Sequence, residues 1–342
     1  MRSLTTLLAG FWIVLCLQLG AAERRCAFDI GSGQIKMQIS DVEEGKILNI
    51  LTSTHVWMPL REDLAHNHND MFSEEIQLSL IKTIQDLLKK GEVFHPDRAH
   101  AIATEPFRIA KNAQEVITRV KKETGLDITV ITQEEEGILG FLSAINEAKI
   151  DPDHVVVWDF GGGSFQLSTR MGEDYVVYQS KLGRVPFRNA VLDIQGKNLK
   201  DTFSPNPIGV QVSCKAIEYV DKCLKDLPET LREKIKKPST TILGIGINPL
   251  WIIRVNCYSR LRVLSEYLQR IHLTDAEIIQ RDSLESRNEY PFIPSNLLLA
   301  YSIMKNLQIK KVLYVGTPSA NAIGLLLTER YWSPANVIPF PQ

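Results

Sequence analysis

Two stretches of this 342-residue chain follow one plan, and this repetition constrains the fold more than any other feature. In each stretch an apolar segment ends in Asp, a glycine-rich turn follows, and two further extended segments are joined by a short turn. The first stretch begins CAFDIGSG at Cys26, and the second begins VVVWDFGGGS at Val155. The leading segment is continuously apolar, as in a strand covered on both faces, whereas the next one alternates apolar and polar residues. We therefore expect two similar α/β halves with a ligand-binding cleft between them.

Helical periodicity follows each unit, because apolar residues recur three and four positions apart. It predicts helices at 73–90, from Thr104 to about Glu123, and at 133–147, with strands at 98–104 and 127–132. In the second half, helices are expected near 209–226, 258–270, 295–307 and 319–330, and strands near 239–245 and 311–316. A chain of this length favours two domains. We place them at 23–132 and 133–342, with the C-terminal helix expected to pack back on the first domain.

The two glycine-rich turns suggest phosphate binding. Glycine lets the backbone come close to an anion, and successive N–H groups then form an anion-binding nest. Asp29 and Asp159 end the two leading strands and would lie near such a phosphate only through a cation, for which Mg²⁺ is the natural candidate. One such turn alone fits an ordinary hairpin equally well, but two in matching contexts favour the phosphate site. Neither turn has the GK[ST] of a nucleotide-binding P-loop.

The sequence resembles the exopolyphosphatase/guanosine pentaphosphate phosphatase (Ppx/GppA) family of the actin-like ATPase and sugar-kinase superfamily. The resemblance runs from Cys26 to about Leu182. It rests on five segments in order, namely AFDIGSGQIKMQISDV, ATEPFRIAKN, GLDITVITQEEEGILGF, WDFGGGSFQL and SKLGRV. It implies two ribonuclease-H-like domains, each a mixed sheet flanked by helices, with an active-site cleft between them.

The resemblance also implies a set of functional residues. Glu136 falls on the family's catalytic glutamate, which would activate a water, and Arg108 is the expected catalytic cation. Glu134 and Glu135 are expected only to complement the helix dipole. Without the resemblance, Arg108 would fit a solvated helix face. The phosphate-binding residues are expected to be Gly31, Ser32, Gly33, Asn112, Gly161, Gly162, Gly163 and Ser164, and the Mg²⁺ ligands Asp29 and Asp159.

The chain departs from the family pattern in several places. Gln166 stands where the second loop of the family has a glutamate, and Gln cannot act as a base or bring negative charge to a metal. The first loop has Gly33-Gln34 where Asn-Ser is usual. The third glycine segment reads GIGIN (244–248), without hydroxyl side chains, and TPSANAIG (317–324) replaces the final L-R-E-G segment, so its arginine is absent. The C-terminal HD-type domain of long family members is missing as well. These departures leave reduced activity open.

The N-terminus predicts export. Arg2 precedes a charge-free apolar run, and Gly20-Ala21-Ala22 supplies small residues for cleavage before Glu23, so 1–22 is expected to be a signal peptide. An uncleaved membrane anchor is the alternative. The expected location is periplasmic or extracellular. Four cysteines then remain, which allow three disulfide pairings. Cys214 and Cys223 are too far apart on one helix to pair with each other.

Three functions stay open. The first is an exported phosphohydrolase that cleaves phosphoanhydride bonds of polyphosphate or guanosine pentaphosphate, and the second is a catalytically weak phosphate- or nucleotide-binding module. The third, an ATP-dependent kinase or ATPase, is disfavoured because ATP is scarce outside the cytoplasm. A formal net charge of −1 disfavours a DNA partner. No membrane partner is expected after signal cleavage, and a homodimer is left open. HNHND (66–70) is expected to be a polar loop rather than a metal site.

Overall fold

The structure is a computed structural model that describes residues 22–67, 69–199, 201–246, 257–282, 290–316, 320–333 and 338–340. In the described residues the first half is built on a six-stranded mixed sheet with the order β12–β4–β1–β2–β3 and β5 beside β4. β1, β2 and β3 form an antiparallel meander, and β1, β4 and β5 run parallel. The strands are β1 (Glu23–Ile30), β2 (Gln34–Glu43), β3 (Lys46–Trp57), β4 (Arg98–Ala103), β5 (Ile128–Val130) and β12 (Ile338–Pro339).

The second half repeats this topology. Its described sheet also has six strands, in the order β10–β11–β9–β6–β7–β8. β6, β7 and β8 form the antiparallel meander, and β6, β9 and β11 run parallel. The strands are β6 (Val155–Phe160), β7 (Phe165–Met171), β8 (Asp174–Ser180), β9 (Thr241–Gly246), β10 (Cys257–Ser259) and β11 (Lys311–Tyr314). The predicted fold of two mixed sheets flanked by helices is confirmed.

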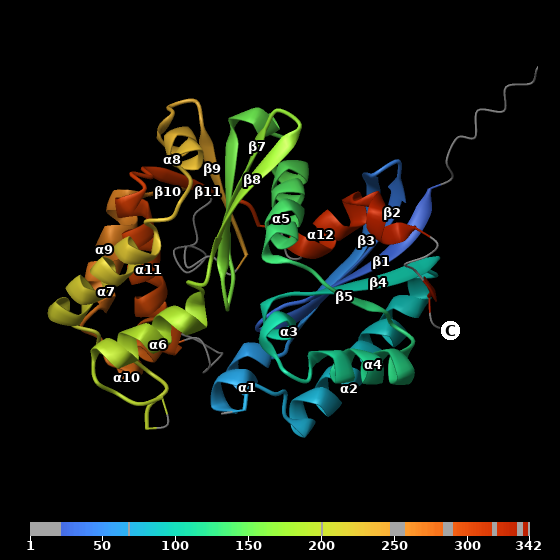
Figure 1. The fold of residues 1–342 in the computed structure, drawn as a ribbon, viewed down its shortest axis with the longest axis horizontal. Coiled ribbons are helices and arrows are strands. Elements are labelled where there is room, and N and C mark those ends of the chain that lie inside the picture. Colours follow the sequence, from blue (N-terminus) through green and yellow to red (C-terminus); the bar gives the residue numbers. More distant parts are fainter. Residues whose placement is uncertain are drawn as a thin grey trace, which may run out of the picture.

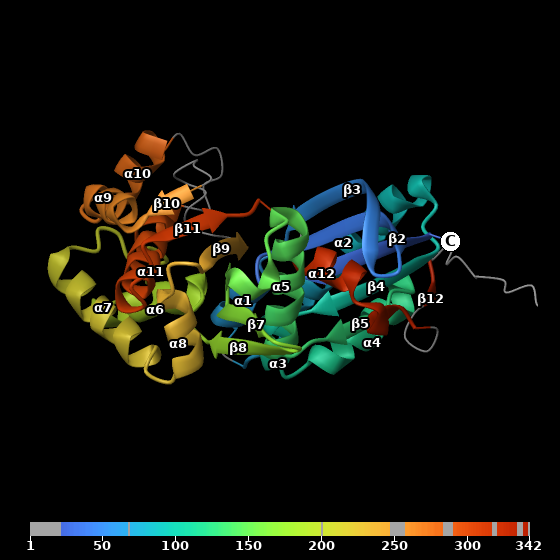
Figure 2. The ribbon, with the colours of Figure 1, turned by 90° about the horizontal axis from the view of Figure 1, so that it is seen from above.

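Helices cover both faces of each sheet, as Figures 1 and 2 show. The outer face of the first sheet packs on α2 and α4, and that of the second on a group that includes α6, α7 and α11. Between the sheets lie α5 and α12 (Figure 1). The helices are α1 (Leu60–His66), α2 (Glu74–Gly91), α3 (Glu105–Ile109), α4 (Ala113–Thr124), α5 (Gln133–Ala148), α6 (Arg184–Ile194), α7 (Val210–Cys223), α8 (Glu229–Lys236), α9 (Arg260–Arg270), α10 (Asp275–Asp282), α11 (Ile293–Asn306) and α12 (Ala320–Leu327).

The two central helices link the halves. α5 begins at a capping box in which the Thr132 hydroxyl accepts from the Glu135 N–H, and the Glu135 carboxylate accepts from the Thr132 N–H. This helix packs on β7 and β8 of the second sheet. α12 comes from the C-terminal part of the chain, yet it packs on β1 and β2 of the first sheet and against α5. The chain therefore returns to the first half, and its last strand, β12, pairs with β4.

One expected helix is wrong. The periodicity predicted a continuous helix from Thr104 to Glu123, but the chain forms α3 and α4 with a break between them. Ala110 has extended backbone angles, and Asn112 lies at the N-terminus of α4. The break is stabilised from outside the segment, because the Asn112 amide bonds both backbone groups of Phe72 and the Lys111 N–H donates to Asp70. Sequence analysis also missed α1, α6, α8 and α10.

Residues 1–21, which hold most of the expected signal peptide, lie outside the described residues. Across the described residues, every helix is too short or too polar to cross a bilayer. Cys26 is a buried strand residue, as expected for a small apolar side chain. Cys214 and Cys223 are both free thiols, in agreement with the distance that their spacing predicts.

Candidate active site

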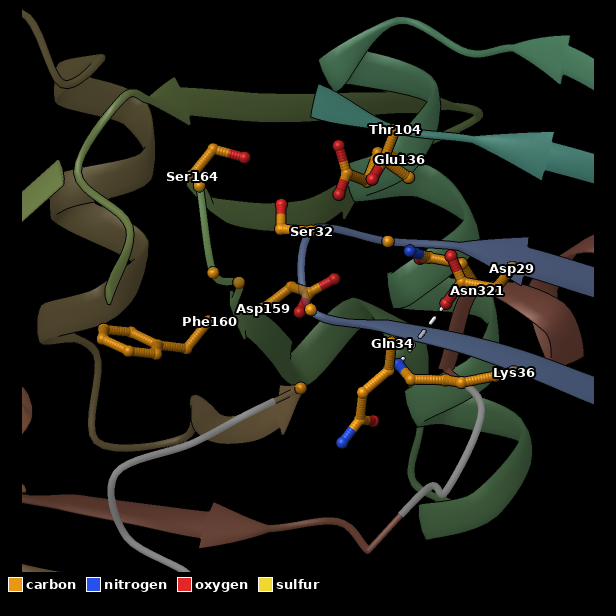
Figure 3. Close-up of a pocket in the computed structure, with 16 residues that line it drawn as sticks. Asp29, Ser32, Gln34, Lys36, Thr104, Glu136, Asp159, Phe160, Ser164 and Asn321 are labelled. Atoms are coloured by element: carbon orange, nitrogen blue, oxygen red, sulfur yellow. Dashed lines mark hydrogen bonds and ion pairs between the residues drawn. The ribbon is translucent and has the colours of Figure 1, made fainter. Parts of the chain in front are cut away.

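The two glycine-rich loops line one pocket in the cleft between the sheets (Figure 3). The first loop follows β1 and the second follows β6, so both lie at the carboxyl ends of the leading strands. Each loop is closed by a backbone hydrogen bond, from Gly31 N–H to Gln34 in one and from Gly161 N–H to Ser164 in the other. Lining residues include all seven of the loop positions that the sequence predicted, namely Gly31, Ser32, Gly33, Gly161, Gly162, Gly163 and Ser164.

The loops touch across the cleft, and this explains why glycine is needed in the second one. A Cβ on Gly162 would lie 2.9 Å from the Cβ of Ser32, and a Cβ on Gly163 would overlap the Glu105 carboxylate. Glu105 accepts from the Ser32 hydroxyl at 3.5 Å and pairs with Arg61 at 3.1 Å. Burial raises the pKa of Glu105, and Arg61 and Arg108 oppose that rise. The second loop therefore packs against both the first loop and α3.

Three carboxylates face the same pocket. Asp29 ends β1, Asp159 lies near the end of β6, and Glu136 projects from the first turn of α5 (Figure 3). All three are buried, with exposed fractions of 2%, 7% and 8% for Asp29, Asp159 and Glu136. The leading strands and the acidic start of α5 thus bring together the three acidic residues that the sequence singled out.

Burial changes the pKa of two of these carboxylates, Glu136 and Asp159. Burial raises the pKa of Glu136 to about 7; Arg108 opposes the rise, and Asp159 and Asp29 add to it. Burial likewise raises the pKa of Asp159 to about 6, where Lys36 opposes the rise and Asp29 adds to it. Because desolvation disfavours a charged carboxylate, the pocket holds two acids that titrate near neutral pH.

Arg108 acts on Glu136 directly. Its Nη2 donates to Glu136 Oε2 at 2.8 Å, and its Nη1 donates to the Ile131 carbonyl at 2.9 Å. Arg108 itself is absent from the residues that line the pocket. The structure therefore gives this arginine a position behind Glu136, where it orients the carboxylate and favours its charged form.

Asn112, which was expected to bind phosphate, is not brought into the pocket. Its amide oxygen accepts from the Phe72 N–H at 2.9 Å, and its amide nitrogen donates to the Phe72 carbonyl at 3.1 Å. The side chain is buried and both of its polar groups are used. Asn112 ties α4 to the segment before α2. Asn112 and Arg108 do not lie on one continuous helix, because the chain breaks between α3 and α4.

Lys36 and Asn321 are among the polar residues of the pocket that sequence analysis missed. Lys36 projects from β2, and its Nζ lies 3.4 Å from Asp29 Oδ2 (Figure 3). Asn321 projects from α12, and its Oδ1 has no hydrogen-bond partner among the described residues. Lys36 belonged to the polar positions of an alternating strand, the kind that face solvent when a sheet is covered on one side. Here α12 covers that face, so Gln38 and Ser40 on β2 are buried as well.

Gln166, the main departure from the family pattern, lies just behind the second loop. It is buried on β7, and its Nε2 donates to the Ser164 hydroxyl at 3.2 Å. Gln166 is the cross-strand partner of Asp159. A carboxylate at this position would stand opposite another carboxylate, which is destabilising unless a cation lies between them.

The donor set suits a weakly held magnesium ion. In the part of the chain that the structure describes, no group of three or more His, Cys, Asp or Glu side chains is placed to hold a metal. Mg²⁺, however, is commonly bound by one or two carboxylates together with waters and substrate phosphates. Asp29 Oδ1 is buried without a hydrogen-bond partner among the described residues, and Asp159 lies in the same pocket. In the HNHND segment, His66 ends α1, and His68 lies outside the described residues.

Two duplicated sheets with glycine-rich loops that meet in a cleft define a two-domain protein of the actin-like ATPase class. Residues 38–244, more than half of the chain, match the Ppx/GppA phosphatase family, and the chain belongs to this family.

Characterised and curated relatives agree with this assignment. Exopolyphosphatase 1 of Mycobacterium leprae is 27% identical over 298 residues, which span 83% of each chain. Exopolyphosphatase 1 of Mycobacterium bovis is 27% identical over 146 residues. This match spans 43% of this chain and 42% of that relative. Retrograde regulation protein 2 of Saccharomyces cerevisiae is 29% identical over 163 residues, 44% of this chain and 27% of that protein.

Solved structures share the fold. The Ppx/GppA enzyme of Aquifex aeolicus superposes with a TM-score of 0.71 at 22% identity, covering 89% of this chain and 99% of that one. An exopolyphosphatase from Cytophaga hutchinsonii gives 0.69 at 16% identity, covering 89% of this chain and 98% of that one. At these identities the likeness concerns the fold alone.

The ion pair of Arg108 and Glu136 generates a first prediction. Arg108→Gln removes the charge that opposes the raised pKa of Glu136, so this pKa is expected to rise above about 7, by roughly 1 to 3 pH units. Infrared difference spectra during a pH titration, with Glu136→Gln to assign the carboxyl band, would measure it. Arg119→Gln is the control, because Arg119 pairs with Glu74 and Glu123 on the surface of α4. An unchanged titration in Arg108→Gln would contradict this account of the site.

Proposed function

We propose that this protein is a phosphohydrolase that cleaves phosphoanhydride bonds, with a water activated by Glu136 and with Mg²⁺ as cofactor. The observation that carries the proposal is the position of Glu136. A buried carboxylate with a pKa of about 7 faces a pocket lined by two glycine-rich loops. General bases work best when their pKa lies near the working pH, and backbone loops of this kind bind phosphate.

The reaction follows from these groups. The deprotonated Glu136 accepts a proton from water while the water oxygen attacks the terminal phosphorus. The bond from that phosphorus to the bridging oxygen breaks in line, and the electron pair leaves with the shortened chain. Phosphoryl transfer of this kind depends mainly on positioning and on neutralisation of charge. The N–H groups of the two loops position the phosphoryl group, and Arg108 keeps Glu136 oriented.

Cations in the pocket must neutralise the negative charge of three carboxylates and of the substrate. Lys36, which lies 3.4 Å from Asp29, is the cation that faces the pocket directly. Asp29 and Asp159 are the residues that would hold Mg²⁺, whose charge would neutralise phosphoryl oxygens when it is bound. Burial raises the pKa of Asp159 and repulsion from Asp29 adds to the rise, and both effects favour a cation beside these two side chains.

The substrate class rests on the relatives. Two of them are named exopolyphosphatase 1, and the family is described as the Ppx/GppA phosphatase family. The resemblance of the sequence motifs adds guanosine pentaphosphate as a second kind of substrate. We therefore propose inorganic polyphosphate, or a guanine nucleotide that carries a similar phosphate chain, as substrate. Both end in a phosphoanhydride that the loops would accept in the same way.

The proposal predicts a distinct behaviour for Glu136→Gln. This nearly isosteric change removes the base, so hydrolysis should fall by about 100- to 10,000-fold while polyphosphate binding persists. In the unchanged protein kcat/KM should rise with pH through about 7, because only the deprotonated carboxylate accepts the proton. Phosphate release from polyphosphate, guanosine pentaphosphate and ATP with Mg²⁺ measures both effects. Glu134→Gln, an exposed neighbour in the same helical turn, is the control. Wild-type rates in Glu136→Gln would remove Glu136 from the mechanism.

A second candidate function is a phosphate-binding module with little hydrolysis, and Gln166 is the observation that favours it. Gln166→Glu should raise turnover where Mg²⁺ is present and should weaken binding where it is absent, because the new carboxylate stands opposite Asp159. A phosphate assay across Mg²⁺ concentrations, beside calorimetric binding, would show this. Gln179→Glu, an exposed position on β8, is the control. Binding without hydrolysis by both the natural protein and Gln166→Glu would establish the module instead.

Export is part of the proposal and rests on the apolar run that ends at Gly20-Ala21-Ala22. The protein would then work in the periplasm or outside the cell. Intact mass of the protein from the extracytoplasmic fraction should show Glu23 as the first residue. A membrane-bound protein that still begins at Met1 would mean that the segment is an anchor.

A further inference from the structure

A second pocket lies at the start of the parallel strands of the second sheet, whereas the glycine loops lie at the other end of these strands. It encloses about 550 Å³ between the end of α8 and the starts of β9 and β11. Its floor is partly apolar, with Ile242, Ile309 and Leu313. Four lysines line its rim, two at the end of α8 and two at the start of β11, and we call them the lysine groove: Lys236, Lys237, Lys310 and Lys311.

Positive charge predominates in the lysine groove. All four lysines are exposed, and none of them takes part in a salt bridge with another residue of the described chain. No acidic residue lines the pocket. Of the acids beside it, Asp153 pairs with Arg170 at 3.0 Å and Asp151 with His154 at 3.2 Å, and Glu233 lies exposed on α8, one helical turn before the first two lysines. Four like charges on one concave surface create a positive potential that favours an anion with several charges.

The position of the groove limits which anions could use both sites. β6, β9 and β11 run parallel. The starts of β9 and β11 lie at the lysine groove, and the ends of β6 and β9 line the pocket of the glycine loops. Gly246 at the end of β9 lines the first pocket, and Thr241 at its start lines the second. Six strand residues span roughly 17 Å at about 3.3 Å per residue. Pyrophosphate or a nucleotide is too short for that path over the surface, whereas a long linear polyanion is not.

We propose that the lysine groove binds the distal part of an inorganic polyphosphate chain whose terminal phosphoryl group lies between the glycine loops. This inference rests on the proposed function and extends it to a preference for long chains. Each phosphoryl unit carries negative charge, so four lysines match four units without any shape-specific contact. Two contacts on one chain act as a bivalent interaction and raise the apparent affinity above that of either site alone.

The lining of the groove disfavours single-stranded nucleic acid. Sites for such chains combine positive charge with aromatic side chains on which bases stack. The residues around this pocket are aliphatic, basic or small polar ones, and none is aromatic. A polyanion without bases fits this surface better.

The test replaces all four lysines of the groove by glutamine, which keeps most of the side-chain stem and removes the charge. In a Glu136→Gln background, binding of long-chain polyphosphate and of tripolyphosphate would be followed by competition with a fluorescent polyphosphate. Long-chain affinity should fall at least tenfold at low salt, and the slope of log K against log salt should shrink by about 3, at about 0.7 to 0.9 per lost contact. Affinity for tripolyphosphate should stay unchanged. With Glu136 intact, KM for long chains should rise while kcat is kept.

The matched control removes the same charge elsewhere. It changes four exposed lysines on helices outside the groove to glutamine, namely Lys89, Lys90, Lys122 and Lys215. Equal losses in the control and the groove variant would overturn the proposal in favour of a general charge effect. If the groove variant loses affinity for single-stranded RNA as strongly as for polyphosphate, the groove binds polyanions in general, and the proposal of a polyphosphate site is overturned.

The outcomes also separate this inference from the proposed function. If the natural protein hydrolyses no phosphoanhydride but long-chain binding still depends on the four lysines, the proposed hydrolase function is wrong. The proposal that the lysine groove binds polyphosphate is then still supported. If polyphosphate is hydrolysed with the same KM by the groove variant, the groove fails and the hydrolase proposal stands.

Discussion

Repulsion among three buried carboxylates is the interaction on which the site depends. Asp29, Asp159 and Glu136 come from three different elements and face one pocket, where burial and mutual repulsion raise the pKa values of Asp159 and Glu136 to about 6 and about 7. Such a cluster persists only because cations surround it. Lys36 approaches Asp29 from β2, and Arg108 holds Glu136 from α3. The proposed site for a divalent cation and the proposed role of Glu136 as a base near neutral pH both rest on this imbalance of charge.

The duplicated sheets explain why these groups meet. In each half the leading strand ends in an acidic residue and a glycine-rich loop, so packing of the halves brings two equivalent loops face to face. The loops are then held by side chains from elsewhere. Glu105 reaches Ser32 and Gly163, and Arg188 of α6 reaches Glu62 of α1 at 3.4 Å. Arg188 is fully buried and lies over the ring of Phe203, so this second link between the halves is desolvated.

Local patterns in the sequence predict part of this arrangement and miss another part for physical reasons. Strand ends and glycine loops depend on neighbouring residues, so Asp29 and Asp159 could be found from local patterns. Glu136 was singled out only through the resemblance to a family. Lys36 and Asn321 could not be found from the sequence, because α12 covers β2 only after the chain has returned to the first half. Asn112 was expected to bind phosphate, but a contact that is distant in sequence places it outside the pocket. Its amide is used by Phe72, a partner that helical periodicity cannot reveal.

Gln166 takes on a different meaning once its strand partner is known. From the sequence it is a lost carboxylate, but in the structure it stands opposite Asp159 and donates a hydrogen bond to Ser164. A glutamate there would add a fourth carboxylate to a pocket that already buries three, and it could no longer donate to that hydroxyl. Gln166 therefore lowers the negative charge that an incoming phosphate meets and keeps the second loop in place. In the proposed function, the neutral side chain favours binding of the anion, and Asp29 and Asp159 are the carboxylates that would hold a metal.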